Sequence, residues 1–198
     1  MSKTDNLKKH TSKNFLQVRL IKNFYNTLLG MVADLGVQKV LDVGCGEGFT
    51  LSELTRNNVG KILEGIDSSA EAISAGKVLM PDMNLREGDV YHLPYEDNSF
   101  DLVICTEVLE HLENPERALN EIIRVSKKYC LFSVPNEPIF RLANFLRGKN
   151  ISRWGNDIEH INHWGSDEFA SFIGSKSKIL AKKTPFPWTM ILTQKNNS

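Results

Sequence analysis

The sequence feature that most constrains the fold is a short apolar run that leads directly into closely spaced glycines. The run Val40-Leu41-Asp42-Val43 is followed by Gly44-Cys45-Gly46-Glu47-Gly48. Glycine permits positive φ angles and lets a ligand approach the main chain within van der Waals contact. A helix that begins after such a turn presents unpaired N–H groups to a carboxylate or a phosphate. We therefore expect a buried strand, a ligand-binding turn and a helix, in this order.

Apolar runs alternate with helical patterns along the first two thirds of the chain. We expect strands at residues 39–43, 62–67, 84–88, 101–106 and 129–134, and helices at 14–35, 50–57, 68–80 and from 115 onward. Thr50 with Glu53, and Ser68 with Glu71, have the spacing of capping boxes. Alternating strands and helices imply right-handed β-α-β units and a mostly parallel sheet.

The last third of the chain has a different pattern. It predicts helices at residues 138–147 and 167–173, and closing strands at 178–181 and 189–193 with a bend at Pro185-Phe186-Pro187. The predicted fold class is α/β, a three-layer α/β/α sandwich of about seven mostly parallel strands. We expect one domain over residues 1–198, with residues 1–13 flexible.

Charge and cysteine content restrict the class of partner and the compartment. Lys and Arg together number 24, as do Asp and Glu, so the formal net charge is zero. A chain that grips a phosphate backbone usually has a basic surplus, so nucleic acid is not the expected partner. The three cysteines include no C-x-x-C pair, which favours free thiols in a reducing compartment. Without a signal-peptide pattern or a membrane-spanning run, the expected location is the cytoplasm.

The glycine spacing distinguishes two classes of cofactor site. Dinucleotide enzymes prefer G-x-G-x-x-G, whereas the third glycine comes one position earlier here. Asp42-Val43-Gly44-Cys45-Gly46-Glu47-Gly48 resembles the first motif of the class I S-adenosylmethionine-dependent methyltransferases. Gly65-Ile66-Asp67, Gly88-Asp89-Val90 and Thr106-Glu107-Val108-Leu109-Glu110-His111 resemble the later motifs, in the same order. The resemblance covers about residues 14 to 175 and is nearest to the type 11, ubiquinone-biosynthesis-like group.

This resemblance implies a Rossmann-like fold and a set of cofactor-binding residues. The glycine turn would lie against S-adenosylmethionine, Asp67 would accept hydrogen bonds from the ribose hydroxyls, and Asp89 would meet the adenine amino group. The implied cofactor-binding residues are Asp42, Gly44, Cys45, Gly46, Gly48, Asp67, Ser68, Asp89, Val90 and Thr106, and S-adenosylhomocysteine would be the product. Each acid has a structural alternative: Asp67 as a helix cap, Asp89 as a turn residue, and Asp42 held by local hydrogen bonds.

Methyl transfer needs an acceptor held in line with the methyl group, with water excluded. An oxygen or nitrogen acceptor can also need a general base, and histidine is the usual candidate. The predicted catalytic residues are His111, Glu107 and His163. Residues 136–165 are expected to form a lid or insertion on the substrate side.

The spacing of Glu107, Glu110 and His111 places them on one face if the stretch is helical, where they could ligate a divalent ion. The Glu-Val-Leu-Glu-His string resembles a metal-associated segment of ubiquinone-pathway O-methyltransferases and of small-RNA 2′-O-methyltransferases, in which a later histidine completes the site. We predict no metal; the candidate ligands would be Glu107, Glu110, His111 and, as the later histidine, His160, with His163 as the alternative. The alternative is that these side chains hydrogen-bond locally and shape the methyl channel.

The expected activity is methylation of a small-molecule or lipid- or sugar-linked acceptor. The rivals are metal-dependent RNA 2′-O-methylation, a dehydrogenase, and a non-catalytic S-adenosylmethionine-binding sensor or partner subunit. Acceptor atom, pathway and oligomeric state stay open, because one fold serves many acceptors.

Overall fold

The computed structural model describes residue 7 and residues 14–137, 139, 141 and 160–196. Its centre is a seven-stranded sheet with the order β3-β2-β1-β4-β5-β7-β6. The strands are β1 (Lys39–Val43), β2 (Ile62–Asp67), β3 (Asn84–Glu87), β4 (Phe100–Thr106), β5 (Ser126–Pro135), β6 (Lys178–Lys183) and β7 (Trp188–Gln194). All pairings from β3 to β5 are parallel, and only β7 runs antiparallel to its two neighbours. The predicted class, a Rossmann-like α/β/α sandwich, is confirmed.

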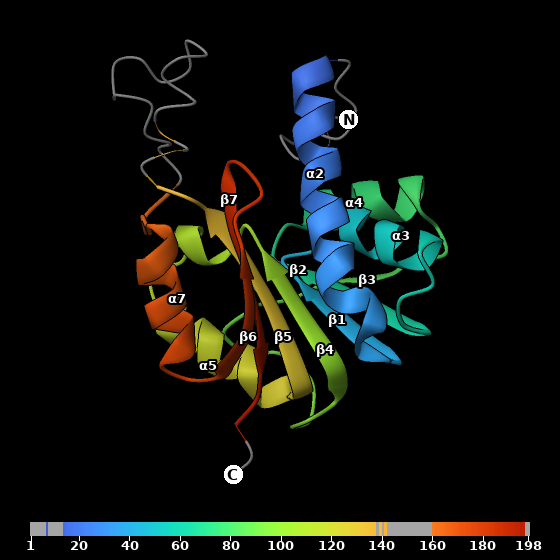
Figure 1. Cartoon of the computed structure of the whole chain (residues 1–198). Helices are drawn as coiled ribbons and strands as arrows, with labels where there is room; N and C mark the ends of the chain where they lie inside the picture. Colours follow the sequence, from blue (N-terminus) through green and yellow to red (C-terminus); the bar gives the residue numbers. More distant parts are fainter. Residues whose placement is uncertain (1–6, 8–13, 138, 140, 142–159, 197–198) are drawn as a thin grey trace.

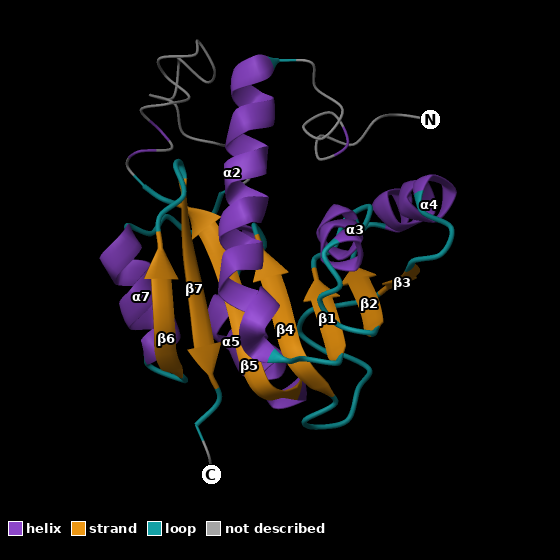
Figure 2. Cartoon of the chain, turned by 45° about the vertical axis from the view of Figure 1, so that its right-hand side comes forward, coloured by secondary structure: helices purple, strands orange, loops and turns teal. Residues whose placement is uncertain are grey.

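Helices cover both faces of the sheet (Figures 1 and 2). They are α2 (Phe15–Val32), α3 (Phe49–Arg56), α4 (Ala70–Leu79), α5 (Pro115–Val125) and α7 (Ser166–Gly174), with 3₁₀ turns η1 (Ala33–Leu35) and η2 (Leu109–His111). One apolar core lies beneath α2, α3 and α4, and a second lies beneath α5 and α7. The layers form because each helix has one apolar stripe, for example the fully buried Ala118, Leu119, Ile122 and Val125 of α5.

The helix N-termini correct both predicted capping boxes. Gly48, in the left-handed region at φ +89°, is the N-cap of α3, so Thr50 lies inside the helix. In α4 the N-cap is Ser69, whose hydroxyl accepts a hydrogen bond from the N–H of Ala72, and not Ser68. The helix after β1 therefore begins two residues earlier than the predicted cap, and the helix after β2 begins one residue later.

The sheet order places the chain reversal between β1 and β4. The carboxyl end of β1 lies between those of β2 and β4, with Asp42 in register with Gly65 on one side and Ile104 on the other. Open α/β sheets bind ligands at such a switch point, because the connections leave in opposite directions and open a crevice. The turns after β1, β2 and β4 are therefore the expected place for a ligand-binding site.

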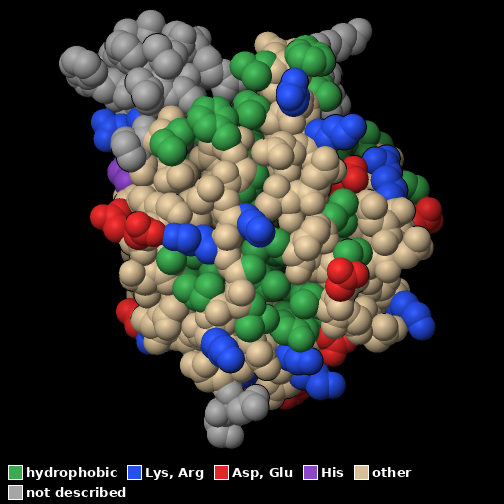
Figure 3. All heavy atoms as spheres, viewed as in Figure 1, with side chains coloured by type: hydrophobic (Ala, Val, Ile, Leu, Met, Phe, Trp, Pro, Cys, Tyr) green, Lys and Arg blue, Asp and Glu red, His purple; other side chains and the backbone are tan. Residues whose placement is uncertain are grey.

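Some of the segments predicted from the sequence lie outside the residues that the structure describes. Of residues 1–13 only Leu7 is described, and the predicted helix at 138–147 and most of the 136–165 segment also lie outside. Figure 3 shows hydrophobic side chains at the upper end of α2, where Phe15, Leu16 and Val18 are exposed. No helix in the described part of the chain is both long and apolar enough to cross a membrane.

Candidate active site

The turn after β1 is held against the end of β2 by main-chain hydrogen bonds. The N–H groups of Gly44 and Cys45 both donate to the carbonyl oxygen of Ile66, at 2.8 and 3.1 Å. The N–H of Gly46 donates to Asp67 Oδ2 at 2.8 Å. Gly44, Gly46 and Gly48 all have positive φ. At Gly44 the requirement is also steric, because a Cβ there would overlap Val108 Cγ2.

A cavity of about 370 Å³ opens beside this turn. It is bounded by the ends of β1 and β2, by the turn after β3, and by the segment after β4. Its lining residues are Val43, Gly44, Ile66, Asp67, Ser68, Gly88, Asp89, Val90, Tyr91, Glu107, Val108, His111 and Leu112. The fold thus brings separate sequence motifs to one cavity.

The cavity includes five of the predicted cofactor residues: Gly44, Asp67, Ser68, Asp89 and Val90. The other five, Asp42, Cys45, Gly46, Gly48 and Thr106, are not among its lining residues. Cys45 is buried, and its Sγ packs over Gly65, where a Cβ would approach it to 2.7 Å. Gly46 and Gly48 belong to the turn, where both have positive φ, but not to the cavity lining.

Asp67 both shapes the turn and lines the cavity. Its Oδ2 accepts the hydrogen bond from Gly46, and its Oδ1 accepts one from the N–H of Ser69 at 2.8 Å. Asp67 is therefore not the cap of α4, which is Ser69; it holds the turn before the helix. Because each carboxylate oxygen has about two acceptor sites, these two bonds leave acceptor capacity toward the cavity.

Asp89 has the local role of a turn residue in addition to its place in the wall. Its Oδ1 accepts a hydrogen bond from the N–H of Tyr91 at 2.8 Å, and its Oδ2 lies 3.1 Å from His92 Nδ1. The bond from Tyr91 and then that from His92 lower the pKa of Asp89. This carboxylate therefore stays charged at neutral pH.

Asp42 lies beneath the turn, with 1% of its surface exposed. Burial, and then the nearby charge of Asp67, raise its pKa to about 8. Neither carboxylate oxygen has a hydrogen-bond partner in the described part of the chain. Local hydrogen bonds therefore do not account for this acid, and its protonated form is favoured in the folded protein near neutral pH.

The segment after β4 does not form the helix that a shared face of Glu107, Glu110 and His111 would require. Glu107 has φ +58°, in the left-handed region, and only residues 109–111 form a 3₁₀ turn. Glu107 therefore does not share a helical face with Glu110 and His111. Its Oε2 accepts a 2.6 Å hydrogen bond from Trp188 Nε1, and its Oε1 accepts a 3.2 Å bond from the Ser133 hydroxyl.

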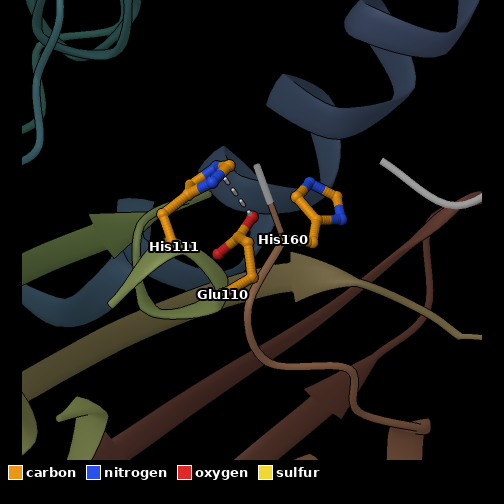
Figure 4. Close-up of side chains that lie close together, drawn as sticks. All are labelled: Glu110, His111 and His160. Atoms are coloured by element: carbon orange, nitrogen blue, oxygen red, sulfur yellow. Dashed lines mark ion pairs between the residues drawn. The ribbon is translucent and has the colours of Figure 1, made fainter. Parts of the chain in front are cut away.

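Glu110, His111 and His160 lie together (Figure 4). His111 Nε2 is 4.0 Å from Glu110 Oε1, and the rings of His111 and His160 are 5.0 Å apart. The ring of His163 lies 6.3 Å from that of His160. In the described part of the chain, two groups have metal-ligand spacing: Glu110 with His111 and His160, and Glu137 with His160 and His163. Glu107 belongs to neither group.

Three residues that build this side of the site had no individual role predicted from the sequence, although two of them lie in the segment 136–165 that was expected on the substrate side. Trp188 holds Glu107, Glu137 lies beside the histidines, and Asn162 donates to the carbonyl oxygens of Leu109 and Leu112 at 3.2 and 2.6 Å. The partners of Trp188 and Asn162 are 50 to 81 residues away in the sequence. Glu137 and Asn162 lie in the segment 136–165 that the sequence predicted on the substrate side, whereas Trp188 carried no such signal.

Comparison with known proteins agrees with this geometry. Residues 41–133 match the family model described as a methyltransferase domain. The chain is 36% identical over 90 residues to the demethylmenaquinone methyltransferase of Renibacterium salmoninarum, covering 46% of this chain and 37% of the relative. It is 34% identical over 138 residues to the phthiotriol/phenolphthiotriol dimycocerosates methyltransferase of Mycobacterium tuberculosis. This match covers 69% of this chain and 48% of the relative.

The fold is shared with solved methyltransferase structures. The magnesium protoporphyrin IX methyltransferase of Synechocystis PCC 6803, solved with bound S-adenosylhomocysteine, superimposes with a TM-score of 0.70 at 16% identity, covering 98% of this chain and 96% of that chain. The chain spans less than half the length of the two curated relatives described above. Residues 41–133 therefore belong to the methyltransferase-domain family, and the chain has the Rossmann-like fold of the class I S-adenosylmethionine-dependent methyltransferases.

Proposed function

We propose that this protein transfers a methyl group from S-adenosylmethionine to a small-molecule or lipid- or sugar-linked acceptor. The observation that carries the proposal is the cavity itself. Its lining contains Gly44, Asp67 and Asp89 together with Glu107 and His111. The residues proposed to bind the nucleoside and those proposed to act on the acceptor therefore border the same space.

The cavity fits the cofactor in size and in the chemistry of its walls. A volume of about 370 Å³ lies in the range of small-molecule sites, roughly 300 to 1,000 Å³. At Gly44 the side chain of Val108 packs against the main chain where a Cβ would stand, so the turn can contribute only backbone to the cavity. Asp67 would accept the ribose hydroxyls, and Asp89 and Val90 would border the adenine. When bound, S-adenosylmethionine supplies a methyl group on a sulfonium, which is a good leaving group.

His111 is the proposed general base for an oxygen or nitrogen acceptor. Its side chain is 36% exposed and lines the cavity, so its imidazole can take a proton and pass it to solvent. Glu107 also lines the cavity, but its carboxylate is held by Trp188 and Ser133, which suits it to orient an acceptor. His163 is exposed and does not line the cavity, so we assign it no step in methyl transfer.

The character of the acceptor is inferred from the cavity and from the relatives. Tyr91, Val108 and Leu112 add apolar side chains to the cavity that Glu107 and His111 also line. The two curated relatives described above are named as methyltransferases of demethylmenaquinone and of phthiotriol/phenolphthiotriol dimycocerosates. Zero net charge disfavours an RNA acceptor. These observations favour an acceptor with an apolar ring or chain and one reactive polar atom.

The first test measures cofactor binding. Isothermal titration with S-adenosylhomocysteine should give saturable one-to-one binding, whereas NAD should neither bind nor raise the melting temperature. Asp67→Asn should weaken S-adenosylhomocysteine affinity at least tenfold. Asp34→Asn, in the exposed turn η1, is the matched control and should leave the affinity unchanged. Equal S-adenosylhomocysteine affinity in the two variants would contradict the proposed nucleoside site.

The second test measures methyl transfer. Labelled S-adenosylmethionine is incubated with fractionated extract of the source organism, with and without chelator. Label should enter an organic-extractable or small-molecule fraction, and His111→Gln should reduce incorporation at least tenfold. Label in RNA that is lost on chelation would favour the rival RNA activity. Tight binding with no labelled product in any fraction would favour the non-catalytic sensor.

A further inference from the structure

Beside the cavity, but outside its lining, the structure assembles a second group of functional side chains. Glu137, His160 and His163 each place one ligand atom within 4.8 Å of the others. Glu137 follows the end of β5, whereas the two histidines come from the segment before α7. None of the three is needed for the methyl transfer proposed above, so another reason must be found for their juxtaposition.

Glu137 is an unusual residue to bury. Only 8% of it is exposed, and in the described part of the chain no hydrogen bond to either carboxylate oxygen meets the usual geometric criteria. Burial raises the pKa of Glu137. The backbone and the positive charge of Arg141 lower this pKa, but by less than burial raises it. A buried carboxylate is costly unless it is paired, and coordination to a metal ion is one of the ways in which proteins pair it.

The main chain around the histidines is held in place independently of their side chains. The N–H groups of Ile161 and Asn162 donate to the carbonyl oxygen of Glu110 at 2.8 and 2.9 Å. The N–H of Glu137 donates to the carbonyl oxygen of Trp164 at 3.0 Å. The two histidines therefore project from a segment anchored both to η2 and to the end of β5. Such anchoring preorganises ligands before an ion arrives.

We propose that Glu137, His160 and His163 form a binding site for a divalent transition-metal ion such as Zn²⁺. Two imidazoles and one carboxylate are a common ligand set for such ions, and they leave positions for water or substrate. Ligand atoms about 2.1 Å from one ion lie roughly 3.3 to 4.2 Å from one another. The present spacing needs only small side-chain rotations, and the exposed ring of His163 has room to make them.

This ligand set differs from the one that the sequence suggested. Glu107 contacts Trp188 and Ser133, and His111 faces the methyl-transfer cavity with Glu110 beside it. His160 has ligand spacing with both groups, so the ring of His111 lies next to the proposed ion site. An ion held by Glu137, His160 and His163 would border the acceptor side of the cavity without occupying it.

The test uses the full chain, stripped of metal and titrated with Co²⁺ and Zn²⁺ in the absence of cofactor and acceptor. The wild type should bind one ion per chain, with visible Co²⁺ absorption that Zn²⁺ abolishes. His163→Asn and Glu137→Gln should each weaken the affinity at least tenfold. His92→Asn is the matched histidine control. His92 belongs to neither group with metal-ligand spacing, so this variant should leave metal affinity unchanged. Because no methyl transfer is measured, failure here would not touch the proposed activity.

Two results would overturn the proposal. One is a wild type that binds no more metal than His163→Asn does. The other is loss of binding in His111→Asn while His163→Asn binds normally, which would place the ion at the Glu110 group. Because His163 is exposed, His163→Asn should fold normally, and an unchanged melting temperature of the metal-free variant would verify this.

Discussion

The indole N–H of Trp188 donates a 2.6 Å hydrogen bond to Glu107 Oε2, across 81 residues of sequence. The same indole packs edge-on against Phe24 of α2, with ring centroids 5.0 Å apart. Through this one side chain, the start of β7 fixes the orientation of a carboxylate in the wall of the cavity and contacts the helix that covers the sheet.

Replacing Trp188 by Phe should keep the ring contact with Phe24 and remove the donor to Glu107. We expect the free energy of unfolding to fall by about 1 to 3 kcal/mol, the range for a lost hydrogen bond to a charged partner. We also expect the rate of methyl transfer to fall about tenfold, because Glu107 loses its orientation. Urea denaturation and initial rates measure the two effects.

A double-mutant cycle with Glu107→Gln tests whether these two residues act as a unit. If they do, the double variant should lose less than the sum of the two single losses. Strictly additive losses in rate and in stability would show that the hydrogen bond does not couple them.

Replacing Gly44 by Ala should abolish nucleoside binding. The new Cβ would overlap Val108 Cγ2, and φ +75° disfavours any side chain at this position. We expect S-adenosylhomocysteine affinity to fall at least 100-fold in calorimetric titration. Gly30→Ala, inside α2 with no atom within 4 Å of its added Cβ, is the matched control. It should keep the affinity and raise stability by up to about 1 kcal/mol.

Replacing Asp42 by Asn should change the pH dependence of stability. The pKa of Asp42 is about 8 in the folded protein, against an ordinary value of 3.8 for an exposed aspartate. Between these values the folded protein holds a proton that the unfolded chain has released. The contribution of Asp42 is therefore fully present below about pH 4 and is lost as the pH rises through about 8.

Denaturant melts from pH 4 to 9 measure this effect as the difference between the wild type and Asp42→Asn. The wild type should lose on the order of a few kcal/mol more than the variant over this range. Parallel pH profiles for the two proteins would show that Asp42 titrates near its ordinary pKa.

Replacing Arg124 by Lys should loosen the loop of residues 93–97 that precedes β4. The Arg124 guanidinium donates to Glu121 and Asp97 and to the carbonyl oxygens of Tyr95 and Leu93, all within 3.0 Å. A lysine ammonium cannot reproduce this planar set of bonds. We expect a loss of about 1 to 3 kcal/mol in the free energy of unfolding.

Arg56→Lys provides the matched control for Arg124→Lys. The Arg56 side chain is 71% exposed and pairs with Glu53 of the same helix. An exposed pair of this kind contributes little, so the stability of this variant should stay within about 0.5 kcal/mol of the wild type. Equal losses in the two variants would mean that the Arg124 network adds nothing specific.

Much of the fold could be predicted because its elements are encoded locally. The strands at 39–43 and 62–67 have the predicted bounds, since a short apolar run between turns fits a buried parallel strand. Asn114 caps α5, with Pro115 at its first turn, as the sequence indicated. The helical geometry under which Glu107 would share a face with Glu110 and His111 is not adopted, because Glu107 turns into the left-handed region, which side-chain spacing alone does not show.

The sequence by itself determined the glycine turn, the alternation of strands and helices, and the acids that follow each strand, because backbone freedom and hydrophobic periodicity act over a few residues. Only the tertiary structure decided that Trp188 holds Glu107 and that Glu137 meets His160 and His163. Those contacts depend on β7 pairing antiparallel with β5, in the register that sets Pro135 opposite Trp188, and on Asn162 anchoring its segment to η2. The physical reason is that a long-range contact is fixed by strand register and packing of the whole sheet, which no short stretch of sequence specifies.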